Sequence, residues 1–353
     1  MNDQLTDADA HARAALDPVV VGDRLASVTG NPAWRMLTVD LISGGKSNLT
    51  FELRSAAGTL ILRRPPTGAL LPSAHDMSRE VRVQRALSGS PVPVPEVVHF
   101  DADGVDLGVP YYVMEKVAGI VVRDAFPDGF ADRPEDRAAL ADGLVDTLTA
   151  IHQVDPQQVG LGDFGRPEGF MARQVSRWAD QWERSRTHAV PEVDELIAVL
   201  GRVEFPESPS AIVHGDYRLD NCLLGADPSR PIAAVIDWEL STLGDSLADL
   251  GMLLFYWCQP GEPVPALTPA ITSLPGFPSR ARVAERYFDR TRDRGDDLPA
   301  FVAFAHLKFA VIAQGIALRT GAGAMAGQDF GNLDEEVVRI AVQGLERFDK
   351  KEI

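Results

Sequence analysis

Apolar and polar residues alternate along the first third of the chain in the manner of β-strands. Residues 36–43, 48–55 and 59–64 combine this alternation with β-branched and aromatic side chains, and glycine-containing connections separate them. Three such strands in succession predict an antiparallel meander. Residues 77–89 then carry apolar side chains at helical spacing, and residues 94–117 read as two further strands. The first 115 residues are therefore mainly sheet with one helix.

Beyond residue 118 the apolar residues recur at the spacing of helices. The helices expected there cover residues 135–154, 169–185, 193–203, 246–257, 280–293, 299–319 and 334–349. Two short strands, 210–215 and 232–238, interrupt this part of the chain, and we expect them to form a central hairpin that carries polar motifs.

These elements predict an α+β fold with a small antiparallel-sheet N-lobe and a larger, mostly helical C-lobe. We expect a leader and a short helix over residues 1–30, the N-lobe over 31–115 and the C-lobe over 116–353. A hinge is expected near residues 115–119.

Composition and charge narrow the classes of partner. The chain has 353 residues, and 34 Lys and Arg against 51 Asp and Glu give a formal charge of −17, which disfavours nucleic acid. The N-terminus lacks the pattern of a secretory signal, and no apolar run approaches about 18 residues, so we expect a cytoplasmic protein without membrane contact. Cys222 and Cys258 are expected to be buried thiols.

Two short polar stretches follow the predicted strands of the second half. In "HGDYRLDN", Asp216 precedes Asn221 by five residues, and "AVIDWE" places Asp237 at the end of the next apolar strand. A base carboxylate beside an amide and a second carboxylate matches the needs of phosphoryl transfer, which uses metal ions and an oriented hydroxyl. A strand followed by an ordinary turn is the structural alternative for each stretch taken alone.

These motifs in order resemble the aminoglycoside phosphotransferase and choline kinase family, whose fold is protein-kinase-like. The resemblance extends from about residue 40 to residue 330. It is closest to the phosphotransferase domain that is fused to some acyl-CoA dehydrogenases, on the stretches "LRRPP", "AIHQVD", "GDSLADLG" and "LKFAVIAQGIALR".

The resemblance implies roles for the polar residues of the second half. Asp216 would be the base or hydroxyl-orienting carboxylate, and Asn221 and Asp237 would be the Mg²⁺ ligands. His214 would support the loop by packing and hydrogen bonding. Two further carboxylates of "GDSLADLG" are assigned to support because Asp at a helix start usually caps it; these are Asp245 and Asp249.

The first half offers the parts of a nucleotide site. "SGGKSN" lies where the family has its phosphate loop, which implies that Gly45, Ser47 and Asn48 contact the nucleotide. Arg63 stands where related kinases have Lys, and Glu80 is its expected ion-pair partner. Its neighbour Arg64 points to the opposite strand face and is expected to be solvated.

"YYVMEKVAG" resembles the hinge that binds adenine in kinase-like folds. The backbone carbonyl of Glu115 and the N–H of Val117 would then bind the base edge. Met114 would lie at the back of that pocket, or would simply belong to the core. The implied phosphate donor is ATP with Mg²⁺; GTP as donor and the oligomeric state are left open.

The resemblance implies that the acceptor is a small hydroxyl-bearing molecule, and the closest branch of the family implies a hydroxyacyl group or a hydroxyacyl-CoA. Tyr217 and Arg218 follow the base and are expected to border the acceptor. Lys308 and Arg319 could bind a phosphate or carboxylate of an acyl-CoA, or could be surface charges. His152 is expected to be a core hydrogen-bonding residue.

Two other functions stay open. An aminoglycoside kinase should place several carboxylates around the acceptor, whereas residues 261–279 form an apolar, Pro-rich stretch that reads as a cover. A nucleotide-binding pseudoenzyme would usually have lost the base or a metal ligand, and all three of Asp216, Asn221 and Asp237 are present.

Overall fold

The chain forms two compact units. The computed structural model describes residues 16–42, 48–66, 76–206, 208–227, 230–264, 266–291, 295–321 and 330–353. The first unit comprises Met1–Ala118 and Ala234–Glu239, and the second comprises Gly119–Ala233 and Leu240–Ile353. The sequence predicted two continuous lobes, 31–115 and 116–353. In the structure, residues 234–239 belong to the first unit, so Asp237 is part of that unit.

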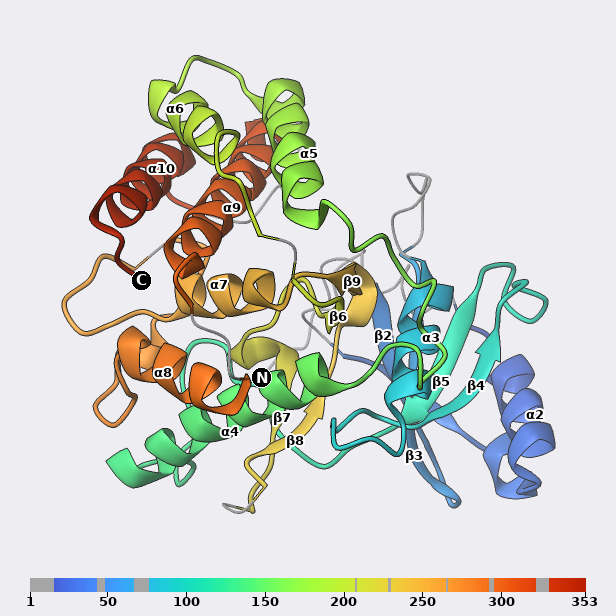
Figure 1. The fold of residues 1–353 in the computed structure, drawn as a ribbon. Coiled ribbons are helices and arrows are strands. Elements are labelled where there is room, and N and C mark those ends of the chain that lie inside the picture. The colour runs from blue at the N-terminus through green and yellow to red at the C-terminus, as the bar shows by residue number, and fades with distance from the viewer. Residues whose placement is uncertain are drawn as a thin grey trace. The chain divides into compact units, whose positions relative to one another are not determined.

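The first unit is built on one five-stranded antiparallel sheet with the strand order β1-β2-β3-β5-β4. The predicted meander is confirmed by the continuous pairing of β1 with β2 and of β2 with β3. The elements of this unit, seen in Figure 1, are α2 (Pro18–Thr29), β1 (Thr38–Leu41), β2 (Leu49–Ser55), β3 (Gly58–Arg64), α3 (Met77–Leu87), β4 (Val97–Asp101) and β5 (Tyr111–Glu115).

The sheet has two apolar faces, because successive side chains of a strand point to opposite sides. Tyr111 and Val113 of β5 lie in one cluster with the apolar side of α2. Tyr112 and Met114 lie in a second cluster with Met77 and other residues of α3. Met114 is therefore a core residue, which was one of the two alternatives.

The expectation that Arg64 is solvated is wrong. The residue is only 5% exposed, and its Nε donates to the carbonyl of Pro65 at 3.2 Å. Burial lowers the pKa of this guanidinium. Strand alternation gives the direction of a side chain, but both faces of this sheet are covered, so direction alone does not predict exposure.

The second unit is mainly helical, as the apolar periodicity predicted. Its long central helix α9 packs against α5, α6, α7 and α10 (Figure 1). The helices are α4 (Pro134–Gln153), α5 (Phe170–Ser185), α6 (Pro191–Leu200), α7 (Ser246–Tyr256), α8 (Arg280–Thr291), α9 (Leu298–Gly321) and α10 (Leu333–Lys350).

Helix α9 corrects the expectation that no apolar run approaches the length of a membrane span. Its segment Leu298–Thr320 has a mean hydropathy of 1.7 over the best 18-residue window, and 78% of that window is buried inside the protein. A helix that is apolar on every side is usually a core helix when its neighbours cover it. The packing of α9 among four other helices fits this description.

The short strands of the second half pair differently from the expected hairpin. Strand β6 (Ala211–Val213) pairs with β9 (Thr242–Gly244), whereas β7 (Cys222–Leu224) pairs with β8 (Ile232–Val235). The sequence did not reveal β7 and β9, because three residues are too few for a clear alternation. Both cysteines, Cys222 and Cys258, are buried, as expected.

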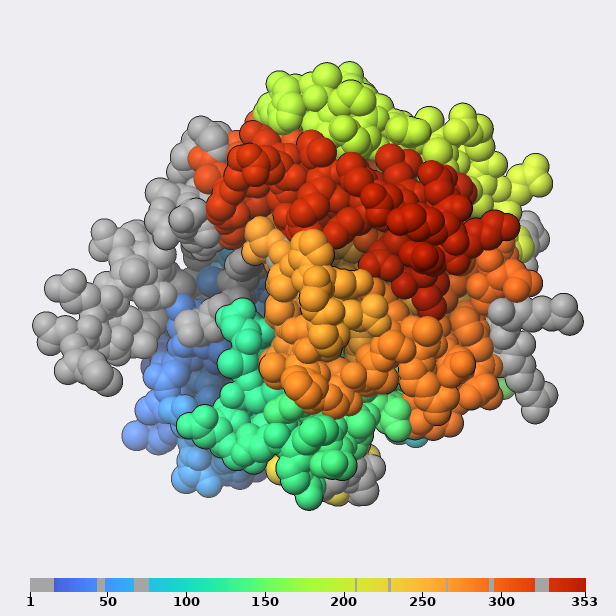
Figure 2. All heavy atoms as spheres, turned by 90° about the vertical axis from the view of Figure 1, so that its left-hand side faces the viewer, coloured from blue at the N-terminus to red at the C-terminus, as the bar shows by residue number. Residues whose placement is uncertain are grey.

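The Pro-rich segment 261–279 follows α7 and precedes α8. Figure 2 shows it in light orange at the surface beside α8 and α10. The backbone N–H of Ala266 donates to Glu336 of α10 at 2.8 Å, and the indole of Trp257 donates to the carbonyl of Pro278 at 2.8 Å. The segment is thus hydrogen-bonded to α10 and to the residue that follows α7.

Candidate active site

Arg63 lies at the centre of a charge cluster in the first unit that is buried at Glu80 and partly exposed at Asp237. Its side chain is 9% exposed and forms ion pairs with Glu80 at 3.3 Å and with Asp237 at 3.0 Å. The ion pair of Arg63 with Glu80 that the sequence predicted is therefore present. Burial alone would lower the pKa of this guanidinium, but Tyr112 and the two carboxylates raise it above its ordinary value.

Glu80 is completely buried in the first turn of α3, a helix that Asp76 caps. The Tyr112 hydroxyl donates to its Oε2 at 2.8 Å, and the side-chain amide of Asn48 donates to its Oε1 at 3.1 Å. Burial raises the pKa of Glu80, the charge of Asp237 adds to this, and Arg63 opposes it. The carboxylate is thus held by three donors.

Asp237 and Glu239 complete the cluster from the segment that returns to the first unit. One oxygen each of Glu80, Asp237 and Glu239 lie within 4.8 Å of one another, and the Asn48 amide donates to Glu239 at 3.3 Å. Asp237 has a φ of +67°, which non-glycine residues rarely adopt and which is common at functional sites.

The donor set of this cluster fits a hard divalent cation. Carboxylate and amide oxygens are the ligands that Mg²⁺ prefers. Among the described residues, the buried side-chain oxygen of Asn48 has no hydrogen-bond partner, and three carboxylates lie together although Arg63 pairs with only two of them. Glu80, Asp237 and Glu239, with Asn48, are therefore the residues of the first unit that could hold a metal.

The remaining nucleotide-site predictions fall on a loop and on the hinge. Gly45 and Ser47 lie outside the described residues. Glu115 ends β5, and its N–H donates to the carbonyl of Glu96 at 2.8 Å; Val117 is partly exposed two residues later. Their roles toward adenine stay predictions.

The "HGD" stretch of the second unit forms a tight loop at the end of β6. Gly215 has a φ of +85°, which favours glycine, and a Cβ there would lie 2.7 Å from the carbonyl oxygen of Leu240. Backbone conformation and available space therefore both require glycine at this position. The ring of His214 is buried, and its Nδ1 accepts from the backbone N–H of Asp216 at 3.3 Å. His214 thus supports the loop, as the resemblance implied.

Asp249 of α7 holds this loop in place by hydrogen bonds to its backbone. Its carboxylate accepts from the backbone N–H of His214 at 2.5 Å and of Gly215 at 2.8 Å, and it lies 3.4 Å from Nε2 of His152. Burial would raise the pKa of Asp249, but His152, His214 and these hydrogen bonds lower it below its ordinary value. Asp249 and the N-cap Asp245 are structural supports.

Asp216 follows this loop, and its carboxylate is bonded on both oxygens. The side-chain amide of Asn221 donates to Oδ2 at 3.0 Å and to the backbone carbonyl of Asp216 at 2.8 Å. The hydroxyl of Tyr256 donates to Oδ1 at 3.0 Å. Tyr256 was not predicted, and its only sequence signal is a tyrosine seven residues after Asp249 in an apolar helix.

The two residues after Asp216 differ in their surroundings. Tyr217 is fully buried, and its hydroxyl donates to the carbonyl of Leu144 at 2.8 Å. The prediction that Tyr217 borders the acceptor is therefore corrected: its ring packs into the core. Arg218 lies 3.5 Å from Asp216 and 2.9 Å from Asp220, and its guanidinium stacks 4.7 Å from the ring centre of Tyr256.

Lys308 of α9 is a buried cation next to the same loop. Its side chain donates to the carbonyl of Gly215 at 2.5 Å and lies 5.8 Å from the ring centre of Trp178. It is 8% exposed, so its reading as a surface charge is wrong, whereas Arg319 is exposed. Burial lowers the pKa of Lys308, and the charges of Asp216 and Asp249 oppose this shift.

His152 is a core residue, as expected. Its side chain is 3% exposed, and its Nδ1 lies 2.7 Å from the hydroxyl of Tyr287. His152 thus contacts Asp249, the residue that holds the loop.

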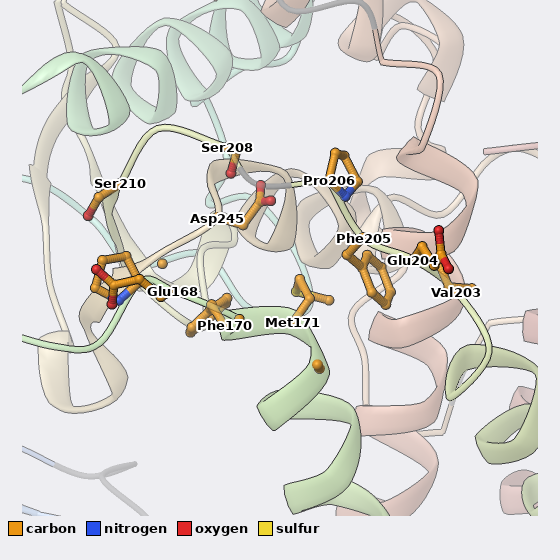
Figure 3. A pocket seen from close by; sticks show the side chains of 14 residues that line it. Glu168, Phe170, Met171, Val203, Glu204, Phe205, Pro206, Ser208, Ser210 and Asp245 are labelled. Atoms are coloured by element: carbon orange, nitrogen blue, oxygen red, sulfur yellow. The ribbon is translucent and has the colours of Figure 1, made fainter.

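Two hollows of the second unit lie near these elements. The first is lined by apolar side chains from the start of α5 and from the connection before β6 (Figure 3). The carboxylates of Glu168 and Glu204 line it as well. Asp245 lines it too, but none of the residues predicted for catalysis or for binding nucleotide, acceptor or metal does. The second adjoins Arg218 and Tyr256, and its apolar lining includes Leu144, Leu253, Trp257 and Ile271.

Known proteins resemble this chain in sequence and in structure. The sequence matches the phosphotransferase enzyme family over residues 38–294. Acyl-CoA dehydrogenase family member 11 of Rattus norvegicus is 36% identical over 317 residues, which are 88% of this chain and 40% of that protein. The chain thus spans less than half the length of this relative.

Among solved structures, a candidate aminoglycoside phosphotransferase from Ralstonia eutropha is 31% identical, with a TM-score of 0.81 over 95% of this chain and 98% of that one. A thermostable mutant of aminoglycoside phosphotransferase APH(4)-Ia, in a ternary complex with ADP and hygromycin B, has a TM-score of 0.59 at 17% identity and covers 91% and 98% of the two chains. At that identity the likeness shows the fold alone. The predicted α+β, protein-kinase-like fold is confirmed.

Proposed function

The chain belongs to the phosphotransferase enzyme family, and on this premise we propose that it is an ATP- and Mg²⁺-dependent small-molecule kinase whose acceptor is the hydroxyl of a hydroxyacyl group or hydroxyacyl-CoA. The observation that carries the proposal is the carboxylate of Asp216, which the Asn221 amide holds at 3.0 Å on a loop anchored by Asp249. A fixed carboxylate of this kind can orient a hydroxyl and accept its proton.

The first unit supplies the groups for the nucleotide in this proposal. Arg63 donates to phosphate oxygens through its planar guanidinium, and Glu80 keeps that guanidinium in place. Asp237, with Glu239 beside it, would hold Mg²⁺. The role of Asn221 as a further Mg²⁺ ligand stays a prediction. When bound, the ion neutralises charge on the phosphates.

The second unit supplies the groups for the acceptor. Asp216 accepts the hydroxyl proton as the oxygen attacks the γ-phosphate in line, and Asn221 keeps the carboxylate in place. The hollow beside Arg218 and Tyr256 has an apolar lining that suits a hydrocarbon chain. The relative named as an acyl-CoA dehydrogenase family member aligns with 88% of this chain over 40% of its own length, and this name supports an acyl acceptor.

An aminoglycoside acceptor is the competing proposal, since solved relatives carry that name. The charges near Asp216 argue against it. Arg218 lies 3.5 Å from Asp216, and Lys308 is bonded to the adjacent Gly215. Arg218 also pairs with Asp220 at 2.9 Å, so these two cations already occupy carboxylate and carbonyl oxygens that could otherwise bind the ammonium groups of such a drug.

The test is transfer of label from γ-labelled ATP, with magnesium, to hydroxyacyl-CoAs, aminoglycosides, choline and homoserine. We expect labelled hydroxyacyl-CoA with the wild type and none with Asp216→Asn. Label in the aminoglycosides alone would replace the acceptor class. No label in any acceptor, with nucleotide still bound, would favour a nucleotide-binding pseudoenzyme over the kinase.

A further inference from the structure

Helix α7 contacts the Asp216 loop at two points. Asp249, in its first turn, accepts from the backbone of His214 and Gly215. Tyr256 lies seven residues later, two helical turns along the same face, and donates to the side chain of Asp216. One helix thus fixes both the backbone before the candidate base and the carboxylate of the base itself.

The ring of Tyr256 is held from several sides. Arg218 stacks on it at 4.7 Å, and Phe309 of α9 meets it edge-on at 5.7 Å between ring centres. Burial, and then the charge of Asp216, raises the pKa of Tyr256 well above its usual value, so the phenol is protonated and donates at neutral pH. These ring contacts do not involve the hydroxyl and would persist in a phenylalanine.

Two donors on different oxygens restrict a carboxylate more than one donor can. Asn221 holds Oδ2 of Asp216 and Tyr256 holds Oδ1, both at 3.0 Å. With Asn221 alone, the carboxylate could rotate about its Cβ–Cγ bond and turn its free oxygen away. Each oxygen keeps a second lone pair that can accept from a substrate hydroxyl.

We propose that Tyr256 is a positioning residue, which orients the carboxylate of Asp216 toward the acceptor hydroxyl. The inference rests on the proposed function, because it assigns Tyr256 a part in that reaction. It goes beyond the family motifs, since Tyr256 lies outside "HGDYRLDN" and "IDWE". The simpler alternative is that Tyr256 only fills space between α7 and α9.

The experiment compares Tyr256→Phe with Tyr111→Phe, each alone and in an Asp216→Ala background. Tyr111 is a matched control because its hydroxyl also donates to an aspartate, Asp106 at 2.8 Å, in the first unit. We expect Tyr256→Phe to lower kcat by about 10- to 100-fold and to leave the KM for ATP within about twofold. In the Asp216→Ala background it should change kcat by less than about twofold, since its effect passes through Asp216.

A fall in kcat of the same size in both backgrounds, or no fall at all, would overturn the proposal. Tyr111→Phe should leave kcat unchanged. If the wild type transfers phosphate to no acceptor, the proposed function fails, and a second cycle decides the contact independently. In urea, the effects of Tyr256→Phe and Asp216→Ala on the free energy of unfolding should then be non-additive; additive effects would show that the hydrogen bond is not made.

Discussion

Arg63 and Lys308 are both buried cations next to a candidate catalytic carboxylate, and they differ in what surrounds them. Arg63, 7% exposed, touches two carboxylates, and its pKa is raised. Lys308, 8% exposed, donates to a backbone carbonyl and faces an indole ring, and burial lowers its pKa.

The two cations are about equally buried, but their pKa values shift in opposite directions. A guanidinium among carboxylates stays charged and presents a planar fork, which suits phosphate oxygens. An ammonium without a carboxylate contact is held at a cost in free energy, and its hydrogen bond to Gly215 shapes the loop before Asp216. We infer that the first unit binds the charged phosphates of the nucleotide and that the second unit positions the base.

The largest effect expected from this division concerns turnover. Asp216→Asn keeps the shape of the side chain but removes the base, so kcat should fall by about 10²- to 10⁴-fold while the KM for nucleotide stays within about twofold. Asp220→Asn, in the same loop and bonded to Arg218, is the matched control and should lose far less. Steady-state kinetics would contradict the division if the nucleotide KM rose most.

Removing Arg63 should have the next largest effect. Arg63→Ala leaves Glu80 buried beside Asp237 without its cation, which should lower the free energy of unfolding by about 3–5 kcal/mol and raise the KM for nucleotide. Urea unfolding measures the loss. Adding Glu80→Gln should restore part of the stability, because it removes the unpaired charge; no recovery would show that the ion pair is not the cause.

Lys308→Met tests the other cation, with a side chain of similar length. It removes the hydrogen bond to Gly215, so kcat should fall while the nucleotide KM does not change. Because the pKa of Lys308 is lowered in the folded protein, the unfolded chain binds more protons between that value and about 10.4. Wild-type stability should therefore rise with pH in that window relative to the variant; a fall would contradict the pKa shift.

The smallest effect should come from Arg319, which lies eleven residues after Lys308 in α9 but is exposed. Arg319→Ala should change the free energy of unfolding by less than about 0.5 kcal/mol in a urea titration. A larger change would mean that the difference between the two cations does not follow from burial.

The sequence predicted the fold well where elements are long. The strands of the first sheet and the seven helices described in the second unit appear where apolar periodicity placed them. The three-residue strands β7 and β9 did not, and the expected hairpin was therefore paired wrongly. Neither could the pattern of strand β3 reveal that Arg64 would be covered, since covering depends on elements distant in sequence.

The site was predictable in its motifs and in the supports that the motifs contain, such as His214 and Asp249, but not in the supports that come from elsewhere in the chain. The pairing of Arg63 with Glu80, and the proximity of Asn221 to Asp216, are present as the spacing and the resemblance implied. Tyr217 is in the core. The sequence could not predict this, because a residue next to a base on a tight loop can point either toward the acceptor or into the core. Tyr256 and Lys308 act through contacts 40 and 93 residues away, which no local pattern records.

The most direct test of the division between the units is the binding of a non-hydrolysable ATP analogue, with magnesium, by titration calorimetry. The account predicts that Asp237→Asn weakens binding by about tenfold or more, whereas Asp216→Asn binds within about twofold of the wild type. Equal binding by both variants, or a loss confined to Asp216→Asn, would contradict it.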